Sequence, residues 1–91
     1  MIDKPVVAAL KRIRKLLVEK GWIQGQLRTA EGRCLIGAMC DACFNASVGR
    51  VHAILKVTAR TSSLGHWNDA KGRTKRHVLA LIDKAIRRAE A

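Results

Sequence analysis

Hydrophobic positions form one continuous run and three helical stripes along the chain. The run covers residues 34–44, reads C-L-I-G-A-M-C-D-A-C-F and contains a single charge, at Asp41. It is too short to span a bilayer, which needs about 20 apolar residues. Leu, Ala and Met favour a helix, and Ile36 is the only β-branched residue of the run. We therefore predict a buried central helix, in which the small Gly37 and Ala38 let a neighbouring helix approach closely.

Three further segments carry apolar residues every three or four positions, the pattern of helices that bury one face. The first begins after a capping Asp3 and ends at Gly21. The second begins after Asn45 or Ser47, and the third begins after Thr74. Their apolar positions are, in chain order, Val6, Leu10, Ile13 and Leu17, then Val48, Val51 and Leu55, then Val78, Leu81, Ile82, Ala85 and Ile86. We expect an all-α fold, a compact bundle of about four helices around the central one, with residues 1–91 forming a single domain.

Two polar connectors separate these helices. The first reads W-I-Q-G-Q-L-R-T-A-E-G-R from residue 22, and the second reads H-W-N-D-A-K-G-R from residue 66. We expect Trp22 to fold back on the core, while the rest of the first connector forms an arm without an obvious strand partner. In the second connector, Trp67 should anchor the loop while Asn68 and Asp69 bond to backbone N–H groups of the turn. Asp69 could also pair with Arg73.

Four short motifs resemble those of one family. W-x-Q-G starts at residue 22, G-R-C-L-x-G-A at residue 32, W-N-D-x-x-G-R-T at residue 67 and V-L-A-L-I-D-x-A at residue 78. Together they resemble a family of small bacterial and phage proteins that is classed as a domain of unknown function. The segment between the central and third helices is shorter here than in that family. The resemblance implies a bacterial or phage cytoplasmic protein, and it implies no known activity, so it transfers no catalytic residue.

The charge balance indicates an anionic partner. The chain has 18 Lys and Arg against 7 Asp and Glu, a net charge of +11. Small domains usually carry a net charge of about 2–8 in magnitude, so solubility alone is the weaker explanation. Nucleic acid and an acidic protein are the partners that such a charge favours. With only two Trp, one Phe and no Tyr, the chain lacks a platform for stacking bases, which favours duplex DNA or RNA over single strands.

Eleven cations of the first helix, the second connector and the last helix are the predicted phosphate contacts. They are Lys11, Arg12, Arg14, Lys15, Lys71, Arg73, Lys75, Arg76, Lys84, Arg87 and Arg88. They would form one positive face if the two terminal helices packed side by side.

The three cysteines all fall in the apolar run. Three is an odd number, and the chain begins without the apolar core of a signal peptide, so we expect a reduced cytoplasmic protein with buried thiols. Cys34, Cys40 and Cys43 could join His52 in a zinc site of three thiolates and one imidazole. On a helix, however, Cys34 and Cys43 fall on nearly opposite faces. We expect no metal and no cofactor.

Cys34 is also the one candidate nucleophile. It stands at the predicted start of the central helix, where a thiol pKa falls, and His66 with Asn68 or Asp69 could supply a base and its orienting group. The alternative is that Cys34 packs in the core while the W-N-D motif organises a loop. A chain of 91 residues leaves little room for a substrate pocket, and this favours a non-catalytic protein.

The sequence thus favours a small basic protein that associates with nucleic-acid phosphates, such as a phage or mobile-element accessory factor. A module that docks an acidic partner protein is the alternative, and an enzyme dependent on Cys34 is the third. A helix-turn-helix over residues 48–67 fits poorly, because the turn lacks Gly and the second helix meets Gly65 at once. We expect no membrane contact, and the sequence leaves the oligomeric state open.

Overall fold

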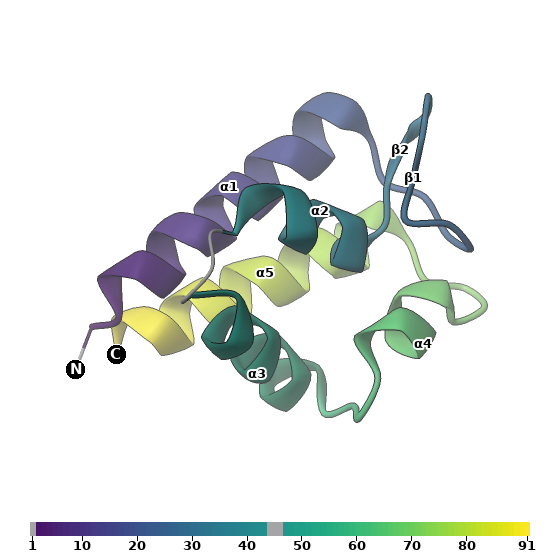
Figure 1. The fold of residues 1–91 in the computed structure, drawn as a ribbon. Helices are drawn as coiled ribbons and strands as arrows, with labels where there is room; N and C mark the ends of the chain where they lie inside the picture. The colour runs from purple at the N-terminus through teal and green to yellow at the C-terminus, as the bar shows by residue number, and fades with distance from the viewer. Residues whose placement is uncertain (1, 44–46) are drawn as a thin grey trace.

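Helices take up most of residues 2–43 and 47–91, the parts of the chain that the computed structural model describes (Figure 1). The elements are α1 (Lys4–Lys20), β1 (Arg28–Thr29), β2 (Gly32–Arg33), α2 (Leu35–Ala42), α3 (Val48–Ala59), α4 (Leu64–Asp69) and α5 (Lys75–Glu90). The fold is therefore mainly α. The expected all-α bundle of four helices is wrong in two respects, because the described residues form five helices and also a small two-stranded sheet.

The two long terminal helices pack side by side and run antiparallel (Figure 1). The backbone N–H of Asp3 donates to the carbonyl of Ala89 at 3.0 Å, so the ends of α1 and α5 meet. Further along the pair, Arg14 Nε lies 2.7 Å from Asp83 Oδ1. These two contacts fix how the helices are aligned.

The core is aliphatic and draws on every helix. Its largest fully buried apolar side chains are Leu10, Ile13 and Leu17 of α1, Leu35 of α2, Val51 and Leu55 of α3, Leu64 of α4, and Val78 and Ile82 of α5. Helix α1 contacts α2, α3, α5 and β2, so the other elements gather around α1. The expected central helix, α2, buries one face and exposes Cys40 and Asp41. The prediction of a helix there is confirmed, but its central place is wrong.

Local signals place the helix ends. The Asp3 carboxylate accepts from the N–H of Val6, and Gly21 ends α1, as predicted. Thr74 begins α5 with a reciprocal capping box, in which its hydroxyl and the His77 ring bond to each other's backbone N–H. Ser47 precedes α3 without a side-chain capping bond to it. Phe44 and Asn45, where the run was expected to end and a cap to begin, lie outside the described residues.

The first connector does have a strand partner. It folds back into a hairpin in which Arg28 pairs with Arg33 and Thr29 with Gly32, and Trp22 bridges to Arg33 on the other side. The paired segments are one or two residues long, too short to leave an alternating pattern in the sequence.

Two glycines let this hairpin press against the end of α1. Gly21 and Gly32 both have positive φ, +94° and +151°, and Arg33 N–H donates to the Gly21 carbonyl at 3.0 Å. A Cβ on Gly21 would overlap the Glu31 carbonyl, and one on Gly32 would overlap the backbone of Gly21. The junction of α1 and the hairpin therefore requires glycine at both positions.

Gly37 makes the corresponding contact on the other side of the hairpin. A Cβ there would overlap the Leu27 carbonyl, which also accepts from Cys34 N–H at 3.0 Å. The close approach was predicted correctly, but the neighbour is the backbone of the hairpin rather than a helix.

Gly37→Ala should lower the free energy of unfolding by about 1–3 kcal/mol, because the added methyl group must displace the hairpin backbone. Gly65→Ala is the matched control. It is also a helical glycine, and its nearest contact would be Ser63 Oγ at 3.9 Å, so alanine should be neutral or slightly stabilising there. Urea denaturation of both variants measures the difference, and equal stabilities would contradict this packing.

Candidate functional site

The W-N-D motif centres on a fully buried amide, that of Asn68. Its Oδ1 accepts from Trp22 Nε1 at 2.6 Å and from the N–H of Leu35 at 3.0 Å. Its Nδ2 donates to the carbonyl of Ile23 at 3.1 Å and to Asp69 Oδ1 at 2.9 Å. All four hydrogen-bonding positions of the amide are used. One side chain thus joins the first connector, the start of α2 and the end of α4.

A second set of bonds surrounds this amide. Gln24 Nε2 donates to the carbonyl of Asn68 at 2.9 Å and to that of Ala70 at 3.0 Å. The N–H of Gly25 donates to Asp69 Oδ1 at 3.0 Å. This bond lowers the pKa of the Asp69 carboxyl, and the hydrogen bond from Asn68 lowers it further by a smaller amount. The W-x-Q-G and W-N-D motifs therefore bind each other. The expectation that Asn68 and Asp69 bond to N–H groups of their own turn is wrong, because the backbone N–H groups they accept from are those of Leu35 and Gly25.

Arg73 stabilises the same turn by another contact than the expected one. Its guanidinium carbon lies 4.0 Å from the ring centroid of Trp67, and its Nε donates to the Trp67 carbonyl at 2.9 Å. Within the described part of the chain it forms no ion pair with Asp69, so that expectation is wrong. A cation over the face of an indole is a favourable arrangement.

The candidate thiol chemistry is not assembled. Cys34 is buried and caps α2, where its Sγ accepts from the N–H of Gly37 at 3.3 Å. Asn68 and Asp69 line the same cavity of about 190 Å³, and Oδ1 of each is engaged in the bonds just described. His66 is exposed on α4, and no hydrogen bond between described residues joins it to Cys34. The predicted pair of Cys34 with a His66 base is therefore not formed among the described residues.

The candidate zinc ligands do not converge either. Among the described residues, no three His, Cys, Asp or Glu side chains are grouped to hold a metal ion, so Cys34, Cys40, Cys43 and His52 form no such set. Cys40 is exposed and Cys43 is half-buried, so the expectation that all the thiols are buried is wrong. Burial raises the pKa of the Cys43 thiol.

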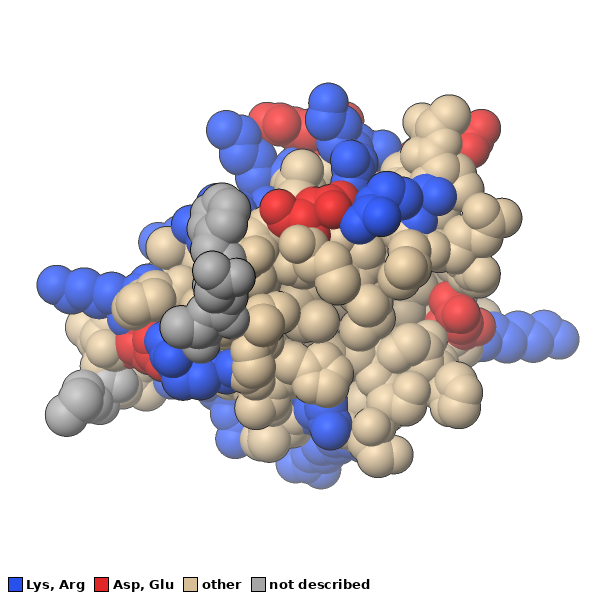
Figure 2. Space-filling view, viewed as in Figure 1, with Lys and Arg blue, Asp and Glu red and all other residues tan. Residues whose placement is uncertain are grey.

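The eleven predicted cations lie on several sides of the molecule. The Arg14–Asp83 pair marks one side of α1 and α5, which we call the outer side. Lys11, Arg76 and Arg87 lie whole helical turns from Arg14 or Asp83, so they share that side with Arg14. Arg12 and Lys15 lie beside Asp41 on the α1–α2 side, Lys84 and Arg88 on the α3 side of α5, and Lys71, Arg73 and Lys75 at or next to the turn before α5. In Figure 2 the cations lie mostly around the margin of one face, whose centre is uncharged.

Sequence reasoning missed the cations that pair with the lone charge of the apolar run. Arg28 and Arg33 both bind Asp41. Their hydrogen bonds lower the pKa of the Asp41 carboxyl, and the bond from Arg33 has the larger effect. The signal was Asp41 itself, since a charge in an apolar run needs partners. Arg12 was counted as a phosphate contact, yet its Nε donates to the Ala42 carbonyl at 2.8 Å and so caps the end of α2.

Comparison with known families agrees with the expectation of a family of unknown function. Residues 1–88 match the model of DUF6197, a family of unknown function. The chain belongs to this family. No curated protein and no solved structure matched this member of DUF6197. In the described residues of this DUF6197 protein, no helix has both the length and the apolarity to cross a membrane.

In this DUF6197 protein, Asn68→Ala should lower the free energy of unfolding by about 2–4 kcal/mol. The change strands the indole N–H of Trp22 and the N–H of Leu35 and also leaves a cavity. Gln26→Ala is the control, because that side chain lies in the first connector, is exposed and bonds to no described residue, so its loss should have a much smaller effect. Chemical denaturation followed by tryptophan fluorescence measures both, and an Asn68→Ala protein as stable as wild type would contradict the role given to this amide.

The three thiols of this DUF6197 protein should differ in reactivity. Cys40 should react first because it is exposed, and Cys43 more slowly because burial and its raised pKa reduce the thiolate fraction. Cys34 should react only when the protein unfolds. Timed alkylation followed by peptide mass spectrometry tests the order, and fast labelling of Cys34 in the folded protein would contradict it.

Proposed function

We propose that this protein associates with nucleic acid by contacting the phosphate backbone, and that the outer side of α1 and α5 carries the contacts. The proposal is supported by the net charge of +11 and by one structural observation. The two terminal helices, which hold most of the predicted phosphate contacts, lie side by side.

The Arg14–Asp83 pair indicates which cations are neighbours on that side. Lys11 lies one turn before Arg14, and Arg87 lies one turn after Asp83. Because the helices are antiparallel, both residues are displaced toward the end of the molecule where α1 begins and α5 ends. Lys11 and Arg87 therefore lie at about the same height along the helix pair. Arg76 lies two turns from Asp83 in the opposite direction.

These cations form a row that is long enough to face several phosphates of a nucleic-acid backbone. Arg76 and Arg87 are about 16 Å apart along α5 at 1.5 Å per residue. One strand of a B-form duplex carries a phosphate about every 3.4 Å of helix axis, so the row spans about five phosphates. Asp83 interrupts the row, but Arg14 neutralises it.

The contacts we propose are independent of base sequence. The helix-turn-helix alternative would need α4 as its recognition helix, and α4 has six residues, of which Leu64 and Asn68 are buried. Trp67 is half-buried under Arg73 and so is poorly placed to stack on bases. Phosphate contacts position a protein on a duplex without reading its bases.

The setting we propose follows from the sequence. The motif resemblance supports a bacterial or phage origin, and a role as an accessory factor of a phage or mobile element fits a small basic protein. Free thiols at three positions support a reducing compartment such as the cytoplasm.

The affinity for duplex DNA should fall linearly with salt on a double-logarithmic plot. Three or so phosphate contacts give a slope of about −3, because each releases condensed counterions. The double variant Lys11→Ala, Arg87→Ala should flatten the slope by up to about two units. Fluorescence anisotropy over a salt series, with duplexes of two unrelated sequences, measures both effects.

The control is the double variant Lys84→Ala, Arg88→Ala. It removes the same charge from the α3 side of α5, about 100° around the helix from the proposed contacts, so its slope should stay near that of wild type. Equal flattening by the two double variants would contradict the proposed side. No measurable affinity for duplex DNA or RNA at low salt would contradict nucleic-acid association altogether.

A further inference from the structure

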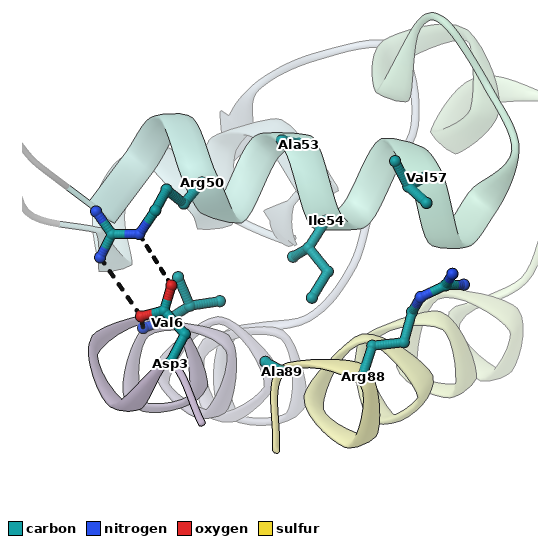
Figure 3. A pocket seen from close by; sticks show the side chains of 8 residues that line it. All are labelled: Asp3, Val6, Arg50, Ala53, Ile54, Val57, Arg88 and Ala89. Atoms are coloured by element: carbon teal, nitrogen blue, oxygen red, sulfur yellow. Dashed lines mark hydrogen bonds and ion pairs between the residues drawn. The ribbon is translucent and has the colours of Figure 1, made fainter. Parts of the chain in front are cut away.

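A groove of about 430 Å³ lies between α3 and the joined ends of α1 and α5 (Figure 3). Its apolar lining includes Val6 of α1, Ile54 of α3 and Ala89 of α5. It lies on the side of α5 away from the proposed phosphate contacts. Its size is within the range of about 300–1,000 Å³ that ligand-binding sites have.

Helix α3 presents an aliphatic stripe to this groove. Ala53, Ile54 and Val57 are spaced so that they share one side of the helix, and Figure 3 shows Ile54 directed toward α1 and α5. Val57 is 59% exposed, although it lines the groove. The described part of the molecule therefore leaves a row of aliphatic side chains in contact with solvent inside a concave surface.

Charged groups stand at both ends of the stripe. At one end, Arg50 Nε lies 2.9 Å from Asp3 Oδ2, and this hydrogen bond lowers the pKa of the Asp3 carboxyl. At the other end, Arg88 lies beside Val57 (Figure 3) and has no ion pair with any residue that the structure describes. The groove thus pairs an apolar lining with a guanidinium group that is available to a carboxylate.

We propose that this groove docks an acidic amphipathic segment of a partner protein. Aliphatic side chains of that segment pack on Ile54 and Val57, and one of its Asp or Glu carboxylates pairs with the guanidinium of Arg88. This is the mode in which an amphipathic helix lays its apolar side in a groove between helices.

Charge and lining select this partner over others. A second copy of the chain brings another +11 and would repel the first. Nucleic-acid bases prefer aromatic surfaces, and the groove lining is aliphatic. A flat lipid surface cannot follow a concave floor.

The experiment uses two labelled synthetic peptides of equal charge. One is a short Glu-rich helix with Leu on one side, and the other has Ser in place of each Leu. Wild-type protein should bind the Leu peptide at least about tenfold more tightly than the Ser peptide. Val57→Asp should weaken binding of the Leu peptide by about tenfold, and Arg88→Ala by a smaller factor of about three to ten.

Each variant has a matched control. Val18→Asp changes another exposed valine, on α1, and Arg87→Ala removes the same charge one residue from Arg88. Both controls should bind the peptide as wild type does. Thermal melting verifies that the variants fold, and Val57→Ser replaces Val57→Asp if the latter does not.

Several outcomes overturn the proposal. Equal affinity for the two peptides shows attraction by charge alone, and equal effects of Val57→Asp and Val18→Asp show that the groove is not used. The partner is a lipid surface instead if the wild-type protein binds neither peptide but adheres to phosphatidylglycerol vesicles, and if Val57→Asp blocks that adhesion. Duplex affinities of the same variants separate this proposal from the phosphate contacts, because Arg87→Ala should weaken duplex binding and Val57→Asp should weaken only peptide binding.

Discussion

The fold depends on one buried amide. Asn68 is a polar side chain without solvent exposure, so each of its hydrogen-bonding groups must find a partner inside the protein. It finds them in Trp22, Ile23, Leu35 and Asp69, which lie in three separate parts of the structure. The hairpin, the start of α2 and the short α4 are held in place together because they share this one side chain.

Periodicity predicted the parts of the fold in which a helix buries one face. Helices α1, α3 and α5 carry their apolar stripes over three turns or more, and Asp3 and Thr74 mark two of their beginnings by local bonds. The short elements escaped prediction, since α4 has six residues and each strand has two. Such lengths are stabilised by tertiary contacts and leave no repeating pattern in the sequence.

The candidate site was predictable only as a set of residue types. The sequence marked W-x-Q-G and W-N-D as unusual, but their mutual bonds join residues 44 to 46 positions apart, which no local pattern reports. The net charge was predictable from the sequence, but the positions of the cations were not. The division of the cations among several sides of the molecule depends on pairs such as Arg14 with Asp83, which are 69 positions apart in the sequence. The groove beside α3 was not predicted, because its lining comes from three helices, α1, α3 and α5, whose approach no local pattern reports.

The pairing of α1 with α5 has a consequence for the newly made chain. Helix α1 is synthesised well before α5, the helix that covers one flank of its apolar side. The 54 residues between Lys20 and Lys75 take roughly 3–11 s to translate at usual rates. During that interval the stripe of α1 lacks the cover of α5, so part of its apolar surface is accessible to a chaperone that recognises apolar helices.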